Sequence, residues 1–237
     1  MFSLVCNKYI ITCHATTSFA RLRRVNKNMP KEEKSKTVYW LENKLYLNIT
    51  NQCSNCCFFC LKRYKRGVAG FNLKLSKEPS IAQITAELDA VLNMRSWVEV
   101  VFCGFGEPTE RLDVLLDVAK WIRQHYGRPL KIRVNTNGHG YLLNPGRDLA
   151  AELKAAGIDK VSVSLNAGDK ETYSEICKPT FEGGYEAVLD FVQKAKSILQ
   201  VEVTAVRMPE VDISKAQAAA EELGVKFRVR EYIPCFY

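Results

Sequence analysis

The chain has no hydrophobic run long enough to cross a membrane. A membrane-spanning helix needs about 18 to 20 consecutive apolar residues, whereas charged residues interrupt every apolar stretch of this 237-residue sequence. Internal repeats, low-complexity tracts and an interdomain linker are also missing. These absences exclude a membrane-spanning protein and a repeat protein, and they favour a soluble protein with a single core domain.

Acidic residues are absent from the first 28 residues, which hold five basic residues among several Ser and Thr. This composition is typical of an organellar transit peptide. A structured extension is a second interpretation, and we favour a third, in which Met29 is the true start and the preceding segment is an artefact. We expect residues 1–36 to be a basic extension, disordered or artefactual, and residues 37–237 to form the core domain. The expected location is the cytoplasm, or an organelle if the first 28 residues are a targeting segment.

The net charge of +8 is concentrated at the N-terminal end. Residues 1–36 hold eight basic and two acidic residues, which leaves only about +2 for the remainder of the chain. A nearly neutral body weighs against a large phosphate-binding face. One basic cluster remains, at Lys62, Arg63, Lys65 and Arg66, and it is either a solvated loop or a local phosphate contact. Nucleic acid is therefore a disfavoured but open partner.

Short runs rich in Val, Ile and Leu alternate with longer helical patterns from Val38 onward, as is typical of βα units around a parallel sheet covered on both faces. The predicted strands are 44–50, 98–103, 130–135, 160–166, 201–207 and 226–230. The predicted helices are one that begins at Ser80 with a Gln83 capping box, 112–126, 148–156, 185–198 and 214–223. We expect an α/β fold of the (βα)6 partial TIM barrel type, with an open, doubly wound sheet as the alternative.

Four of the nine cysteines crowd into eight residues directly after the first predicted strand, at Cys53, Cys56, Cys57 and Cys60. Disulfide geometry is poor within so short a segment, so free thiolates that bind metal fit better. The spacing reads as C-x3-C-x2-C, which uses Cys53, Cys57 and Cys60, or as two adjacent C-x2-C knuckles. Two knuckles would suit a structural zinc ion, but here the backbone would have to fold back within one bond.

Three cysteines can hold three irons of a 4Fe-4S cluster and leave the fourth iron open to a small molecule. A ferredoxin-like electron carrier would need a fourth cysteine, either Cys56 or a distant thiol. A ferredoxin-like electron-transfer protein and a zinc-binding structural protein therefore stay as alternative functions.

The C-x3-C-x2-C triplet, with Phe59 before its last cysteine, resembles the signature of the radical S-adenosylmethionine (SAM) superfamily. Residues 102–109, Phe-Cys-Gly-Phe-Gly-Glu-Pro-Thr, look like the Gly-Gly-Glu-Pro motif of that family. Residues 134–138 and 161–167, at the ends of the third and fourth predicted strands, are similar to family segments that approach the cofactor. Together the segments imply a radical SAM core domain.

Within the superfamily, residues 38–50 and 101–107 look closest to the radical SAM proteins that are named for their association with TatD-type hydrolases. This closer resemblance implies a functional link with a metal-dependent hydrolase. It does not imply a substrate.

Residue by residue, the resemblance implies that Cys53, Cys57 and Cys60 bind three irons of one 4Fe-4S cluster and that SAM chelates the fourth. Glu107 and the backbone carbonyls of Gly104 to Gly106 would hold the ammonium group of SAM. The alternative interpretation is that Glu107 is a surface loop carboxylate or the negative charge at the N-terminus of the next helix. The remaining implied cofactor contacts, each with a turn or packing role as its alternative, are Phe59, Asn135, Asn137, Ser164 and Asn166.

The implied reaction is reductive cleavage of SAM at the cluster to a 5'-deoxyadenosyl radical, which acts on an unidentified substrate. An external donor of the flavodoxin or ferredoxin type would supply the electron. No residue can be named as a catalyst acting on the substrate. Residues 203–207 lack the glycines often found in the family's adenine-contacting segment, and the seven residues after the sixth predicted strand are too few for a second cluster domain.

Overall fold

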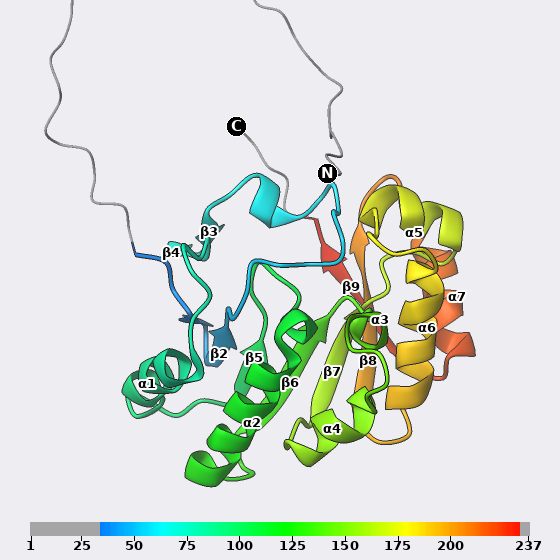
Figure 1. Ribbon diagram of the computed structural model, residues 1–237. Coiled ribbons are helices and arrows are strands. Elements are labelled where there is room, and N and C mark those ends of the chain that lie inside the picture. Colours follow the sequence, from blue (N-terminus) through cyan, green and yellow to red (C-terminus); the bar gives the residue numbers. More distant parts are fainter. Residues whose placement is uncertain (1–33, 233–237) are drawn as a thin grey trace, which may run out of the picture. The chain divides into compact units, whose positions relative to one another are not determined.

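The computed structural model describes residues 34–232 (Figure 1). The basic extension expected at residues 1–36 lies almost wholly outside this range, as does the targeting segment. Within the described residues, no helix combines the length and the apolar character that crossing a membrane requires.

The described residues fold around one seven-stranded sheet. Its strands are β1 (Val38–Leu41), β2 (Lys44–Leu47), β5 (Glu99–Phe102), β6 (Lys131–Thr136), β7 (Lys160–Ser164), β8 (Gln200–Arg207) and β9 (Lys226–Glu231). The strand order is β1-β2-β5-β6-β7-β8-β9, in which β1 pairs antiparallel with β2 and every later pair is parallel. The six parallel strands confirm the six that were predicted, and β1 is an addition.

The strand order distinguishes the two predicted architectures. A doubly wound sheet reverses its strand order at a switch point, whereas this sheet follows the chain from one edge to the other. All its crossover helices can therefore lie on one face, and Figure 1 shows them along the outer side of the sheet. The doubly wound alternative is wrong, and the topology is that of a partial barrel with β1 and β9 at its open edges.

Five helices correspond to the predicted ones: α1 (Ile81–Leu92), α2 (Leu112–Tyr126), α4 (Leu149–Ala155), α6 (Gly184–Ala195) and α7 (Ile213–Glu222). The capping box of α1 is formed, because Ser80 Oγ accepts from Gln83 N and Gln83 Oε1 accepts from Ser80 N. Elements that were not predicted are η1 (Leu61–Arg63), β3 (Gly67–Val68), β4 (Phe71–Asn72), η2 (Pro108–Arg111), α3 (Gly140–Leu143) and α5 (Lys170–Cys177).

The two faces of the sheet differ in chemistry because successive side chains of a strand alternate between them. The outer face is apolar and joins the helices in the main core, with the fully buried strand residues Leu45, Leu47, Val100, Phe102, Ile132, Val134, Val161, Val163 and Val203. The inner face carries ion pairs such as Arg133–Glu99 at 3.0 Å and Arg228–Glu202 at 3.0 Å. The inner face is covered as well, since Arg133, Ser162, Glu202 and Thr204 are buried, but its side chains are largely polar.

Candidate active site

A cavity of about 460 Å³ lies where the parallel strands end, which is the position of active sites in βα barrels. Every residue that the sequence predicted to bind the cluster or SAM lines it. These residues are Cys53, Phe59, Cys57, Cys60, Gly104, Gly106, Glu107, Asn135, Asn137, Ser164 and Asn166. The fold thus brings the motifs of four different strand ends to one place.

The crowded cysteines do not all face this cavity. Cys53, Cys57 and Cys60 line it, while Cys56 is exposed and its Sγ lies 3.6 Å from Arg63 Nη1. Among residues 34–232, no three metal-binding side chains converge on a position for a single metal ion. A zinc site of two knuckles would need all four thiols around one ion. Three thiols that line one cavity, with the fourth turned away, fit a polynuclear cluster better.

The cysteine loop is docked along the C-terminal end of α5. Cys56 N donates to Cys177 O at 3.0 Å, and Phe58 N donates to Ile176 O at 3.2 Å. Directly after Cys53, Ser54 O accepts from Thr180 N at 2.9 Å. Backbone hydrogen bonds therefore hold the loop on a helix that the sequence analysis did not predict.

A buried histidine supports the loop from behind. His139 Nδ1 lies 3.1 Å from Ser54 Oγ, and its Nε2 lies 3.1 Å from Gly184 O and 3.0 Å from the Tyr173 hydroxyl. Because a carbonyl only accepts, the network assigns the proton to Nε2 and leaves Nδ1 to accept from Ser54. Burial lowers the pKa of His139, so the imidazole is neutral at pH 7. The Tyr173 hydroxyl extends the network by accepting from Asn55 Nδ2 at 3.0 Å.

The three cavity thiols are held in a setting that disfavours a free thiolate. Burial, followed by the charge of Glu107, raises the pKa of Cys53 to about 12. A hydrogen bond with Cys177, followed by burial, raises the pKa of Cys57, and burial raises that of Cys60. Positive charge from bound metal would stabilise the thiolates in this setting.

Glu107 is buried and accepts hydrogen bonds at both carboxylate oxygens. Its Oε1 accepts from Thr109 N at 3.1 Å, from Thr109 Oγ1 at 2.8 Å and from Thr136 Oγ1 at 2.8 Å. Its Oε2 accepts from Asn137 N at 2.6 Å. Burial raises the pKa of Glu107, and these hydrogen bonds act in the opposite direction. Glu107 therefore caps η2, as its structural alternative required, and it also lines the cavity.

The two glycines before Glu107 are needed because two loops touch there. A Cβ at Gly104 would lie 2.0 Å from Asn48 Oδ1, and a Cβ at Gly106 would lie 2.5 Å from both Thr50 O and Gln52 O. The sequence predicted that the backbone at these glycines approaches the cofactor closely, and both glycines line the cavity. The structure adds a second close approach, since the side of each glycine that a Cβ would fill faces the segment that leads into the cysteine loop.

The polar residues at the ends of β6 and β7 are already engaged within the protein. Asn137 Nδ2 donates to Ser54 Oγ at 2.8 Å, and its Oδ1 accepts from His139 N at 3.0 Å, so the predicted turn role is realised. Asn135 Oδ1 accepts from Arg133 Nη1 at 2.7 Å. Their presence in the cavity wall agrees with the prediction, but their amide groups have structural partners as well.

Arg230 is a cavity residue that the sequence analysis missed. Its Nη2 donates to Asn166 Oδ1 at 3.1 Å and to Ser164 Oγ at 3.5 Å. The alternation along β9 carried the signal, because it places Arg228 and Arg230 on one face of the strand. Arg207, at the end of the neighbouring strand β8, is exposed and paired with Glu231 at 3.2 Å.

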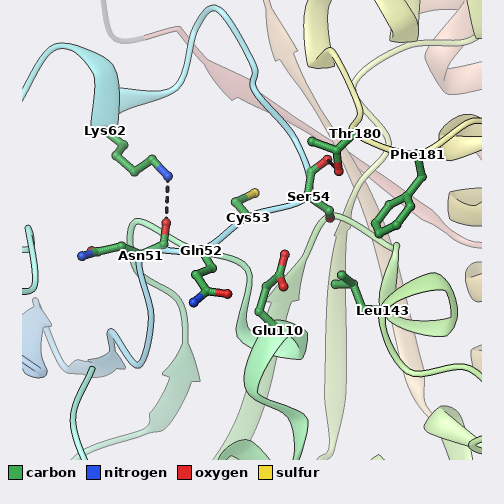
Figure 2. Close-up of a pocket in the computed structure, with 9 residues that line it drawn as sticks. All are labelled: Asn51, Gln52, Cys53, Ser54, Lys62, Glu110, Leu143, Thr180 and Phe181. Carbon is green, nitrogen blue, oxygen red and sulfur yellow. Dashed lines mark hydrogen bonds between the residues drawn. The ribbon is translucent and has the colours of Figure 1, made fainter. Parts of the chain in front are cut away.

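A second pocket of about 500 Å³ lies beside the first, and Cys53 and Lys62 line both. Figure 2 shows Glu110 rising from η2 toward the segment that carries Cys53 and Ser54, and Lys62 donating to the Asn51 carbonyl, which is 2.8 Å away. None of the predicted SAM contacts lines this pocket. The cavity at the strand ends is therefore the candidate active site.

Known proteins resemble this chain in sequence. Probable GTP 3',8-cyclase of Saccharolobus islandicus (strain L.S.2.15 / Lassen #1) is 31% identical over 166 residues, which cover 69% of this chain and 46% of the relative. Probable GTP 3',8-cyclase of Thermococcus kodakarensis is 30% identical over 155 residues, which cover 65% of this chain and 44% of the relative. The chain thus spans slightly less than half the length of these relatives.

Solved structures share the fold. TYW1 with a lysine-pyruvate adduct bound aligns with a TM-score of 0.57 at 16% identity, over 82% of this chain and 67% of that protein. The FeFe-hydrogenase maturase HydG from Carboxydothermus hydrogenoformans aligns with a TM-score of 0.58 at 20% identity, over 81% of this chain and 44% of that protein. At such identities the likeness shows the partial-barrel fold alone.

The family follows from a match that covers most of the described barrel. The model of the Radical SAM superfamily matches residues 47–223, from the end of β2 to the end of α7. The cysteine loop and Glu107 both lie inside that range. Because the match covers well over half of the sequence, the chain belongs to the radical SAM superfamily and is a radical SAM enzyme.

Proposed function

We propose that Cys53, Cys57 and Cys60 hold three irons of one 4Fe-4S cluster and that the fourth iron takes the amino and carboxylate groups of SAM. The family implies both cofactors. One observation carries the assignment of residues: these three thiols line a single cavity with Glu107, while Cys56 is turned out toward Arg63.

Glu107 would bind the ammonium group of SAM. A carboxylate oxygen has two lone pairs, and among the described residues Oε2 accepts one hydrogen bond, from Asn137 N, so it keeps capacity for a further donor. A buried carboxylate also gains from a nearby cation, which offsets the burial that raises its pKa. The carbonyls of Gly104 and Gly106 would add acceptors beside it.

The polar residues at the strand ends would face the remainder of SAM. Ser164 and Asn166 support contacts with the ribose hydroxyls and the methionine carboxylate, and Asn135 would add a third polar group. Both amide atoms of Asn137 already bond to Ser54 and His139, so Asn137 would act mainly by positioning the cysteine loop. Phe59 packs edge-on against Phe58, with ring centroids 5.6 Å apart, and would shield the cluster near the adenine.

When bound, the cluster and SAM supply reductive cleavage to a 5'-deoxyadenosyl radical that abstracts hydrogen from the substrate. The chain's own residues would bind and orient the cofactor and exclude water from the cavity. The family requires a reductant, and we propose an external one-electron donor of the flavodoxin or ferredoxin type.

The test is anaerobic reconstitution of the cluster, followed by an assay for 5'-deoxyadenosine with dithionite as reductant. A loaded cluster should give 5'-deoxyadenosine only when SAM is present. A fully loaded protein that binds SAM but forms no 5'-deoxyadenosine would overturn the proposal.

The names of the relatives make a purine nucleoside triphosphate the first substrate class to test. Because the chain spans less than half of those proteins, the cyclisation reaction itself does not follow. Incubation with SAM, dithionite and GTP, with ATP in parallel, should consume one nucleotide as followed by mass spectrometry. If neither is consumed, this substrate class is wrong.

The link with a TatD-type hydrolase rests on the resemblance of residues 38–50 and 101–107 to a subfamily, and it stays a proposal. Co-purification with the TatD-type hydrolase of the same cell would support it. Cytoplasmic location and organellar import also stay proposals, because they depend on residues 1–33, which lie outside the described range.

A further inference from the structure

Two arginines of β9 have matching positions and different partners. Arg228 and Arg230 lie two residues apart and therefore on the same face of the strand. Arg228 Nη2 donates to Ser162 Oγ at 3.5 Å and to the carboxylate of Glu202 at 3.0 Å. Arg230 Nη2 makes the equivalent contact two residues further along the strands, where it donates to Ser164 Oγ at 3.5 Å. Within the described residues it has no carboxylate partner.

The register of the sheet explains the difference. Ser162 of β7 lies beside Glu202 of β8, and Ser164 lies beside Thr204. The position beside Ser162, next to Arg228, therefore holds the carboxylate of Glu202. The equivalent position beside Ser164, next to Arg230, holds Thr204, whose hydroxyl donates to Val163 O at 3.4 Å. The second acceptor of Arg230 is the neutral Oδ1 of Asn166, at 3.1 Å. The protein thus pairs one arginine with a carboxylate and leaves the next without one among the described residues.

The guanidinium of Arg230 also has a donor without an acceptor. Its Nε is buried and makes no hydrogen bond with the described residues. Burial lowers the pKa of Arg230, yet an arginine stays protonated in proteins. A buried charged donor without a partner is unfavourable unless a ligand completes its hydrogen bonds.

The unpaired guanidinium faces the candidate active site, since Arg230 lines the same cavity as the three cysteines and Glu107. The cysteine loop and Glu107 follow β2 and β5, whereas Arg230 belongs to β9 at the far edge of the sheet. Under the proposed function, the fourth iron already takes the carboxylate of SAM. Ser164 and Asn166, which would contact SAM, also hold Arg230 through its Nη2, and its Nε is left for a second ligand.

We propose that Arg230, held by Ser164 and Asn166, binds an oxyanion group of the substrate, either a phosphate or a carboxylate. The inference rests on the proposed function, because it places the substrate in the cavity that holds SAM. The planar guanidinium presents adjacent N–H donors that match the oxygens of such a group. The bound anion would supply the counter-charge that Glu202 supplies to Arg228.

The test measures anion binding to the cluster-loaded, SAM-bound protein by anaerobic calorimetry. The probes are inorganic phosphate, pyrophosphate and malonate, and the proteins are wild type, Arg230→Gln and Arg230→Lys. The matched control is Arg207→Gln, which removes the same charge from an exposed arginine of the neighbouring strand that does not line the cavity.

At least one probe should bind the wild type saturably. Arg230→Gln should weaken that binding by about tenfold or more, Arg230→Lys by less, and Arg207→Gln should leave it unchanged. Preference for pyrophosphate would identify a phosphorylated substrate, and preference for malonate a carboxylated one. The inference is overturned if no probe binds the wild type, or if Arg230→Gln binds it as tightly.

SAM itself carries a carboxylate, so its affinity is measured in parallel from the change that SAM causes in the electron paramagnetic resonance signal of the reduced cluster. Arg230→Gln should leave SAM affinity within about twofold of wild type. A larger loss would assign Arg230 to the cofactor and overturn the inference. If Arg230→Gln does not fold, the same comparisons are made with Arg230→Lys.

Failure of this inference can be told apart from failure of the proposed function. Formation of 5'-deoxyadenosine without anion binding would remove the oxyanion site and leave the radical chemistry in place. Anion binding through Arg230 in a cluster-loaded protein that forms no 5'-deoxyadenosine would overturn the radical chemistry and leave the oxyanion site in place.

Discussion

His139 Nδ1 lies 3.1 Å from Ser54 Oγ, which places a buried, neutral imidazole directly behind the first cysteine of the cysteine loop. Ser54 Oγ also accepts from Asn137 Nδ2 at 2.8 Å, and the same amide lies 3.8 Å from Cys53 Sγ. The position of Cys53 is therefore tied to the end of β6 through Ser54.

Replacement of His139 by Phe should loosen the cysteine loop while keeping a ring of similar size. The change leaves Ser54, the Gly184 carbonyl and the Tyr173 hydroxyl without their shared partner, and each buried unsatisfied group costs about 1–3 kcal/mol. We expect a lower free energy of unfolding and a lower iron content after reconstitution. The control is His125→Phe, because His125 is exposed and bonds only to the Trp121 carbonyl. Equal iron content in the two variants would contradict the role of His139.

Replacement of Cys57 by Ser should abolish cluster binding, whereas replacement of Cys56 by Ser should leave it intact. Cys57 lines the cavity and Cys56 is exposed beside Arg63. Iron content and the visible absorption spectrum of the reconstituted proteins measure the difference. If Cys56→Ser loses iron as completely as Cys57→Ser, the C-x3-C-x2-C interpretation is wrong.

Replacement of Glu107 by Gln should impair both folding and SAM binding. The carboxylate accepts from donors of Thr109, Thr136 and Asn137. An amide offers one acceptor oxygen, so its NH2 group must face at least one of these donors, at a cost of about 1–3 kcal/mol. We expect a lower melting temperature and SAM affinity reduced by about tenfold or more. The neighbouring Glu110→Gln serves as the control, and unchanged SAM affinity in Glu107→Gln would refute the ammonium site.

Glu202 should make stability depend on pH in the acid range. Burial raises its pKa, but hydrogen bonds from Lys160, Arg228 and Ser162 outweigh this effect and hold the pKa at about 2, below the ordinary 4.5. A carboxyl whose pKa is lower in the folded state stabilises the protein above its unfolded-state pKa. This contribution, roughly 3 kcal/mol, is lost as the pH falls from about 5 to about 2.

The comparison of wild type with Glu202→Gln isolates this contribution. The variant should be less stable at pH 7, because Lys160 and Arg228 lose their shared counter-charge, and its stability should fall less between pH 5 and pH 2. Chemical denaturation at several pH values gives both quantities. Parallel pH profiles for the two proteins would show that Glu202 does not account for the acid sensitivity.

Several features of the site were predictable because they are local in the sequence. The spacing of Cys53, Cys57 and Cys60, and the placement of Glu107 after a strand, are set within a few residues. The alternation of short apolar runs with helical patterns likewise predicted all six parallel strands and five helices. The closer resemblance of residues 38–50 and 101–107 to a subfamily stays a prediction.

Other features depend on segments that are distant in the chain. No local pattern relates His139 to Ser54, which are 85 residues apart. The docking of Cys56 N on Cys177 O depends on α5, whose short polar sequence carried little helical signal. No local pattern indicated that the space a side chain would need at Gly104 and Gly106 is taken by the segment that leads into the cysteine loop.

By itself, the sequence determined the cysteine triplet, the glutamate loop and the succession of strands and helices, because each depends on spacing and periodicity along the chain. The tertiary structure alone decided that Cys56 faces outward, that His139 stands behind Cys53 and that Arg230 lacks the carboxylate that Arg228 has. The last of these follows from the order and register of the strands. In particular, the register sets Glu202 beside Ser162 and Thr204 beside Ser164, and so leaves one charged arginine facing the cavity.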